Sequence, residues 1–125
     1  DTLFLPFYSF YEKITLFNKG QFFRDLIYVS DVISALKIIM KKGKSGNLYW
    51  ISSGKKTWFY KFGNLLANLS GTKVIFSPTP KYTKKVDVGN FVVNNSKLKR
   101  LGWNPKVPIE PGIKLTIDYF QSLKN

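Results

Sequence analysis

Residues 20–36 read GQFFRDLIYVSDVISAL, and within this stretch a short apolar run gives way to a helical pattern. Residues 26–29 and residues 14–17 are both apolar and rich in β-branched or aromatic side chains, and the turn-forming triplet 18–20 lies between them. This arrangement predicts two short strands. A helix is predicted next, with Ser30 as its N-cap and Gly43 at its end, because apolar residues recur at helical spacing: Val32, Ala35, Leu36, Ile39 and Met40.

The residues that follow predict further short elements. Residues 48–51 (LYWI) are continuously apolar, as expected of a strand covered on both faces in a parallel sheet. A second helix is predicted from the N-cap Thr57 to Gly71, and the residues on its apolar stripe are Trp58, Phe62, Leu65, Leu66 and Leu69. The remaining predictions are a strand at 73–76, a polar surface loop at 77–88, a short helix at 96–101 closed by Gly102, and a last helix at 110–123 with Ile113, Ile117, Phe120 and Leu123 facing inward.

The chain has 125 residues, the size of one ordinary domain, and its hydrophobic share of 44% is sufficient for a packed core. Cysteine is absent, which excludes disulfides and thiol chemistry and makes a cytoplasmic location the expectation. The chain starts at Asp1, and the apolar residues 2–11 have no basic flank and are too short to span a bilayer. We therefore expect a trimmed start, with no signal peptide and no membrane partner.

The formal net charge of +13 raises the question of a nucleic-acid partner. The basic residues form only short groups, at 41–44, 55–56, 81–85 and 97–100, and are otherwise spread along the chain without a nucleic-acid motif. Such dispersion is typical of a solvated surface. A basic nucleic-acid-binding domain is therefore the weakest of the functional hypotheses, whereas a small anionic ligand fits the charge.

Several kinds of catalytic site are excluded by composition. The chain has no His and no Cys, so the commonest general base and the commonest metal ligands are missing. It has seven acidic residues, none of them paired at a spacing that indicates a glycosidase or a hydrolytic metal site. We therefore do not expect this chain to be an enzyme on its own.

Four motifs, in order along residues 14–125, resemble those of extended short-chain dehydrogenase/reductases, the NAD-dependent epimerase and dehydratase family. RDLIYVSDV at 24–32 resembles Arg-Asp-Phe-Ile-Tyr-Val-x-Asp-Val, and NLYWISSGKKT at 47–57 resembles the family's Tyr-Asn-Ile-Gly-Ser-Gly strand and helix entry. SKLKRLGWNP at 96–105 resembles Ser-Lys-x-x-x-x-Leu-Gly-Trp-x-Pro, and residues 109–123 resemble the closing helix. Residues 1–13 form a leading segment outside the match.

The resemblance implies an α/β fold in which residues 1–125 are a single C-terminal, substrate-binding region with short strands and about four helices. The Rossmann half that binds NAD(P) in the complete enzyme would be missing, because the chain has no Gly-x-x-Gly-x-x-Gly or Gly-x-Gly-x-x-Gly run. The family's catalytic Tyr-x-x-x-Lys is also absent, since no Tyr is followed by Lys four positions later. Neither a catalytic residue nor a bound cofactor is therefore expected in this chain.

The resemblance also implies which residues hold a nucleoside-diphosphate sugar. Arg24 aligns with an Arg that contacts the diphosphate, and a guanidinium is suited to forked hydrogen bonds with phosphate oxygens. Lys84 and Asp87 align with the Arg and Asp of Arg-x-Gly-Asp-Val, which contact phosphate and ribose, although Lys84 replaces Arg and Val86 replaces Gly. Phe17 aligns with an aromatic near the nucleobase. The alternatives are an Arg24–Asp25 ion pair or a surface role for Arg24, solvent exposure for Lys84, and core packing for Phe17.

The leading hypothesis is a C-terminal substrate-binding fragment of an NAD-dependent nucleotide-sugar epimerase or 4,6-dehydratase, completed by an N-terminal Rossmann domain. The alternative is a catalytically inactive stand-alone nucleotide-binding module or a decayed paralogue. In either case the apolar residues 48–51 lack sheet partners within the chain, which predicts self-association through an exposed apolar strand or face.

Overall fold

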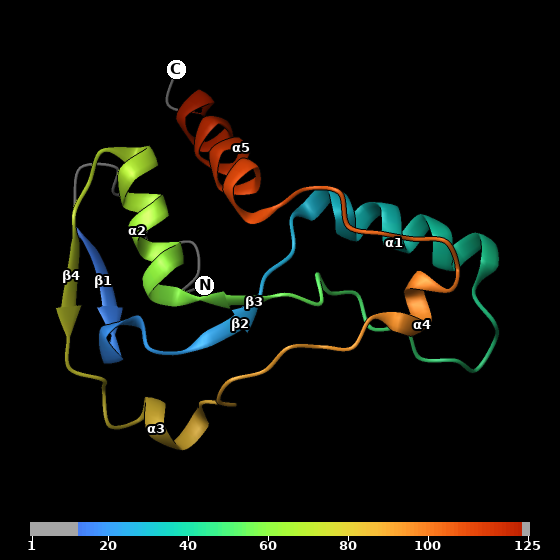
Figure 1. The fold of residues 1–125 in the computed structure, drawn as a ribbon, viewed down its shortest axis with the longest axis horizontal. Coiled ribbons are helices and arrows are strands. Elements are labelled where there is room, and N and C mark those ends of the chain that lie inside the picture. Colours follow the sequence, from blue (N-terminus) through green and yellow to red (C-terminus); the bar gives the residue numbers. More distant parts are fainter. Residues whose placement is uncertain (1–12, 124–125) are drawn as a thin grey trace.

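The computed structural model describes residues 13–123 and contains short strands and helices gathered at two ends (Figure 1). In chain order, the elements are β1 (Ile14–Phe17), the 3-10 helix η2 (Asn18–Gly20), β2 (Phe23–Asp25), α1 (Val29–Lys42), β3 (Lys56–Trp58), α2 (Phe59–Ser70), β4 (Val74–Ser77), α3 (Thr83–Val86), α4 (Ser96–Lys99) and α5 (Ile109–Ser122). We call β1, β4, α2 and α5 the β1–β4 region. We call α1, α4 and residues 101–107 the α1 region. The α/β fold class expected from the sequence is confirmed.

Two strand pairs connect distant parts of the chain. β1 pairs with β4 in parallel, from Ile14 opposite Val74 to Phe17 opposite Ser77. β2 pairs antiparallel with β3, so that Arg24 lies opposite Thr57. The segment between β1 and β4 includes α2, which contacts both strands. The parallel pair and its connecting helix therefore form one layered unit.

The core of the β1–β4 region follows from the alternation of side chains along β1. Ile14 and Leu16 are buried, while Thr15 and Phe17 point away from this core. The helices cover Ile14 and Leu16 with Leu66 and Ala67 of α2 and Ile113 and Ile117 of α5. Gly63 allows α2 to approach β1 closely, because a Cβ there would lie 2.8 Å from Leu16 Cδ1.

The core of the α1 region is smaller and is held partly by polar contacts. Ala35, Leu98 and Trp103 are its buried members, and Ile38, Ile39 and Ile51 are among the partly buried residues around them. Trp103 Nε1 donates to Ser34 Oγ at 2.9 Å. The carboxylate of Asp31, which is 3% exposed, accepts from the backbone N–H groups of Lys106 at 2.9 Å and Val107 at 3.0 Å. Trp103 is therefore a packing residue at the centre of this core.

Several sequence predictions agree with the structure. β1 has the predicted bounds, and β4 is offset by one residue from the predicted 73–76. α2 ends before Gly71, which is left-handed as a helix-terminating glycine often is. α4 and α5 lie where the short helix and the last helix are predicted.

The strand predicted at 26–29 is wrong. Residues 23–25 form β2 instead, because they are the ones that pair with β3, and α1 already begins at Val29 with Tyr28 rather than Ser30 as its N-cap. Thr57 is also not an N-cap, and Trp58 is not on the helix, because both belong to β3 and α2 begins at Phe59. Pairing between two remote segments thus determines both boundaries.

Other predictions fail where the chain supplies no partner or where a turn is short. Residues 48–51 form no strand, since no strand within residues 13–123 pairs with them. The loop predicted at 77–88 contains the single-turn helix α3. The residues predicted to face inward that are instead exposed are Leu36, Met40, Leu69 and Leu123. No helix in the described part of the chain is long and apolar enough to cross a bilayer.

Candidate functional site

The strand β2 sends two successive charged side chains in different directions. Asp25 accepts from the backbone N–H groups of Ser53 at 2.8 Å, Gly54 at 3.0 Å and Val93 at 3.1 Å. Its carboxylate therefore ties β2 to the 52–54 turn and to the segment before α4. Alternation along a strand leaves the neighbouring Arg24 on another side, free of Asp25. The structure thus replaces the Arg24–Asp25 ion pair considered above with a different one.

Arg24 is held in place by four groups. Its Nη2 donates to Asp87 Oδ1 at 2.6 Å, and its Nη1 donates to the carbonyl oxygen of Phe23 at 3.0 Å. The guanidinium carbon lies 5.1 Å from the ring centroid of Phe22 and 5.5 Å from that of Phe91, within the range of cation–π attraction. A guanidinium has five N–H donors, so these contacts leave donors available for a further anion.

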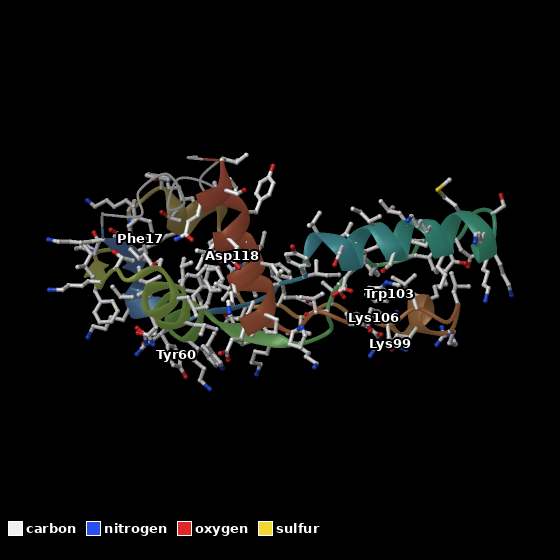
Figure 2. The ribbon with its side chains drawn as sticks, turned by 90° about the horizontal axis from the view of Figure 1, so that it is seen from above. Phe17, Tyr60, Lys99, Trp103, Lys106 and Asp118 are labelled. Carbon is white, nitrogen blue, oxygen red and sulfur yellow. The ribbon has the colours of Figure 1, made fainter. Side chains whose placement is uncertain are left out.

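A cavity of about 730 Å³ contains all four residues predicted to bind the ligand. Phe17 comes from the end of β1, Arg24 from β2, and Lys84 and Asp87 from α3 and the residue after it. In Figure 2, Phe17 lies at one end of the molecule, far from Trp103 in the α1 region. The rest of the lining is Asn18, Phe22, Pro78, Thr79, Thr83 and Val86.

The charges in this cavity suit an anionic ligand. Arg24 and Lys84 contribute two positive charges and Asp87 one negative charge, so the lining is net +1. Phe17 and Phe22 add aromatic surface. Phe17 is 38% exposed and projects away from the core below β1, so the alternative of core packing does not hold. Lys84 is exposed as well as part of the cavity wall, so both interpretations of it remain compatible with its position.

Sequence reasoning missed Phe22, Phe91 and Thr83. Phe22 stands two positions before Arg24 in the quoted motif, and this closeness was a signal that was not used. Phe91 lies 67 positions from Arg24, and nothing in the sequence indicates that its ring reaches the guanidinium. Thr83 lies in the segment predicted as a plain loop, where a helical turn places it in the cavity wall.

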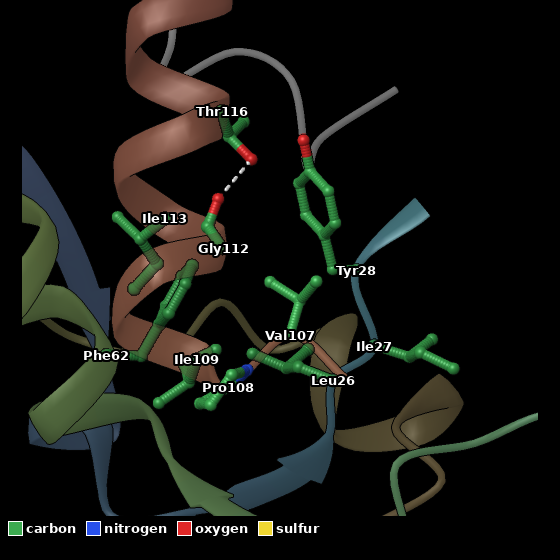
Figure 3. A pocket seen from close by; sticks show the side chains of 10 residues that line it. All are labelled: Leu26, Ile27, Tyr28, Phe62, Val107, Pro108, Ile109, Gly112, Ile113 and Thr116. Atoms are coloured by element: carbon green, nitrogen blue, oxygen red, sulfur yellow. Dashed lines mark hydrogen bonds between the residues drawn. The ribbon is translucent and has the colours of Figure 1, made fainter. Parts of the chain in front are cut away.

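A second cavity, of about 180 Å³, lies between α5 and the residues that connect β2 to α1 (Figure 3). Its lining is mainly apolar, with Phe62, Val107 and Ile113 among its members, and it contains no charged side chain. The hydroxyl of Thr116 is already used, since it donates to the carbonyl oxygen of Gly112 at 2.8 Å. This cavity offers no cation that would bind a phosphate. The cavity around Arg24 is the candidate site because the four predicted residues line it.

Residues 13–123 contain neither a cluster of metal-ligating side chains nor a long helix that starts at a glycine-rich turn. No group of three or more His, Cys, Asp or Glu in residues 13–123 is placed to hold a metal ion. The three long helices of this part follow Tyr28, Trp58 and Pro108, so none of them begins at a glycine-rich turn that could admit a pyrophosphate.

No family model matches the chain, but individual proteins do. It is 28% identical to dTDP-D-glucose 4,6-dehydratase of Bos taurus over 114 residues, covering 87% of this chain and 32% of that protein. It is 26% identical to the low-salt glycan biosynthesis protein Agl12 of Haloferax volcanii over 117 residues, covering 87% and 35%. The chain spans about a third of the length of these curated relatives.

Solved structures of similar enzymes also match most of this chain over about a third of their own length. UDP-glucose 4-epimerase of Thermotoga maritima, determined with UDP-glucose, has a TM-score of 0.80 and 32% identity, covering 91% of this chain and 36% of that one. The dTDP-glucose 4,6-dehydratase of Bacillus anthracis, determined with NAD, has a TM-score of 0.79 at 21% identity, covering 96% and 38%, and this likeness shows the fold.

Proposed function

We propose that this chain, which is homologous to the extended short-chain dehydrogenase/reductases of the NAD-dependent epimerase and dehydratase family, is the C-terminal part of such an enzyme and holds its nucleoside-diphosphate sugar. The observation that carries the proposal is the cavity in which Phe17, Arg24, Lys84 and Asp87 meet. These residues come from separate elements and span 70 positions of sequence, yet the same four follow from the motif resemblance alone.

Each residue has a role that suits its chemistry. Arg24 and Lys84 would contact the diphosphate, Arg24 through a planar fork and Lys84 as a point charge. Asp87 would accept from a ribose hydroxyl, and Phe17 would lie against the nucleobase. Holding the diphosphate fixes the sugar relative to reacting groups that this chain does not contain.

Hydride transfer would belong to the remaining two thirds of the parent protein, together with NAD(P) and the catalytic Tyr and Lys. This chain alone is then inactive, and its contribution is binding and orientation. Epimerisation and dehydration both begin with a sugar nucleotide held in this way, so the site is compatible with either reaction.

The exposed apolar surface of the α1 region supports the proposal that a Rossmann part of the complete enzyme packs against this chain. α1 buries Ala35 on one side, while Val29, Ile33, Leu36 and Met40 form an exposed stripe at spacings of four, three and four residues on another side. A helix that is apolar on more than one side is normally covered on all of them. We propose that the Rossmann part of the parent covers this outer stripe and supplies the strand that residues 48–51 lack.

The binding proposal is tested by thermal unfolding of the full chain with UDP and with dTDP. A ligand present at 100 times its Kd stabilises the folded state by about 2.7 kcal/mol, which raises the melting temperature by several degrees. Arg24→Ala is expected to remove most of this shift. Arg100→Ala is the matched control, because it removes the same charge from an exposed position after α4. No shift with either nucleotide, or an equal loss in both variants, contradicts the proposal.

A further inference from the structure

One polar side-chain atom of the candidate site has no partner. Thr83 Oγ1 is the single buried side-chain nitrogen or oxygen within residues 13–123 without a hydrogen bond. A buried hydroxyl that loses its hydrogen bonds to water is destabilising, so such groups are uncommon and call for an explanation. Thr83 lies in the wall of the same cavity as Arg24, Lys84 and Asp87.

Other hydroxyls on helices of this molecule have a hydrogen-bond acceptor within their own helix. Thr116 Oγ1 donates to the carbonyl oxygen of Gly112 at 2.8 Å, and Ser70 Oγ donates to that of Leu66 at 2.7 Å, in each case four residues earlier in the same helix. Thr83 is the first residue of α3, so the residue four positions before it, Thr79, lies outside the helix. The usual intrahelical acceptor is therefore missing at Thr83.

The surroundings of Thr83 indicate which group would accept a hydrogen bond from its hydroxyl. Lys84 and Asp87 flank it on the same turn, and Asp87 brings the guanidinium of Arg24 to this turn through their 2.6 Å contact. A phosphate oxygen attracted by these cations would lie beside a hydroxyl that has no other acceptor. A threonine in a helix populates two staggered rotamers, and rotation about Cα–Cβ exchanges methyl and hydroxyl, so the hydroxyl can turn towards a bound ligand.

We infer that Thr83 is a further ligand-binding residue, whose hydroxyl donates to a phosphate oxygen of the bound nucleoside diphosphate. The inference rests on the proposed function and adds to it a residue outside the motif resemblance. It has a consequence that a structural role lacks: the hydroxyl contributes to affinity for the ligand but not to stability without it. Removal of the hydroxyl should therefore lower affinity for the ligand without lowering stability in its absence.

The test measures UDP affinity by isothermal titration calorimetry and the melting temperature without ligand, both on the full chain. Thr83→Val keeps the shape and removes the hydroxyl, and it should weaken UDP binding about tenfold, as expected for a hydrogen bond to a charged group. Its melting temperature without ligand should be equal to or above that of the unsubstituted chain. Thr83→Ala is the second variant without a hydroxyl, whereas Thr83→Ser keeps the hydroxyl and should bind UDP like the parent.

Thr116→Val is the matched control, because it removes a helical hydroxyl that already has a partner, in the other cavity. It should lower the melting temperature and leave UDP affinity unchanged. If Arg24→Ala weakens binding but Thr83→Val and Thr83→Ala do not, the inference for Thr83 is overturned and the proposed function stands. An equal loss in Thr83→Ser and Thr83→Val also overturns it, since the methyl group would then be responsible. If the parent chain does not bind UDP or dTDP, both proposals fail.

Discussion

The β1–β4 region and the α1 region are built on different kinds of contact. In the first, a parallel strand pair and two helices bury six aliphatic residues against one another. In the second, the buried hydrophobic residues among those the structure describes are Ala35, Leu98 and Trp103, and the polar groups of the buried Asp31 and of Ser34 hold the surrounding backbone and the indole of Trp103. The outer face of α1 stays apolar and exposed. The first region forms its core from its own elements. The second leaves an apolar helix face exposed, as is typical of a helix that packs against a further layer of structure.

Removal of Trp103 should have the largest effect on this comparison. Trp103→Ala deletes the largest member of a three-residue core, and we expect it to lower the free energy of unfolding by about 3–5 kcal/mol. Leu66→Ala is the counterpart in the β1–β4 region, with an expected loss of about 2–5 kcal/mol. Hydrogen exchange should show lost amide protection in α1 and α4 for the first variant and in α2 and β4 for the second. Loss of protection throughout both regions in each variant would mean that they share one cooperative core.

A smaller effect is expected from the polar contacts of the α1 region. Asp31→Asn keeps the shape but replaces one accepting oxygen with an amide that donates, so one of the N–H groups of Lys106 and Val107 loses its partner. The expected loss in free energy of unfolding is about 1–3 kcal/mol, measured by urea denaturation. Asp118→Asn is the control, because Asp118 is exposed on α5 and its change should stay within about 0.5 kcal/mol. Equal losses in the two variants would show that the buried carboxylate contributes no more than a surface charge.

The same contrast explains which parts of the fold could be predicted from sequence. β1, α2, β4 and α5 have their packing partners within the chain, so local periodicity and turn residues are sufficient to locate them. Residues 48–51 have the pattern of a buried strand but no strand beside them, and pattern alone does not reveal a missing partner. β2 begins three residues before the predicted strand because its pairing with β3 is a contact over about 30 positions, which periodicity does not contain.

The candidate site shows a similar division. The motif resemblance led to Arg24 and Asp87, which lie 2.6 Å apart although 63 positions separate them. It did not lead to Phe91 or Thr83, because their roles depend on how the segment after β4 folds over the end of β1 and β2. A family motif carries such information only for the residues that it contains. The ring beside Arg24 and the unpartnered hydroxyl could be found only from three-dimensional structure.

The smallest effect on stability, and the sharpest test of the second region, concerns the outer stripe of α1. Leu36→Gln combined with Met40→Gln removes two exposed apolar side chains, so the free energy of unfolding should change by no more than about 0.5 kcal/mol. We expect the unsubstituted chain to self-associate with rising concentration, because association buries the exposed apolar stripe. The double variant should remain monomeric in analytical ultracentrifugation. Lys37→Gln is the control on the polar side of the same helix and should associate like the unsubstituted chain.

In a chain extended to the full length of its relatives, other residues of the same chain would cover the stripe, so the double substitution there should lower the melting temperature and leave association unchanged. A parent chain that stays monomeric, or a double variant that associates as strongly, would show that the outer face of α1 is an ordinary exposed surface and that the two regions do not differ in the way described.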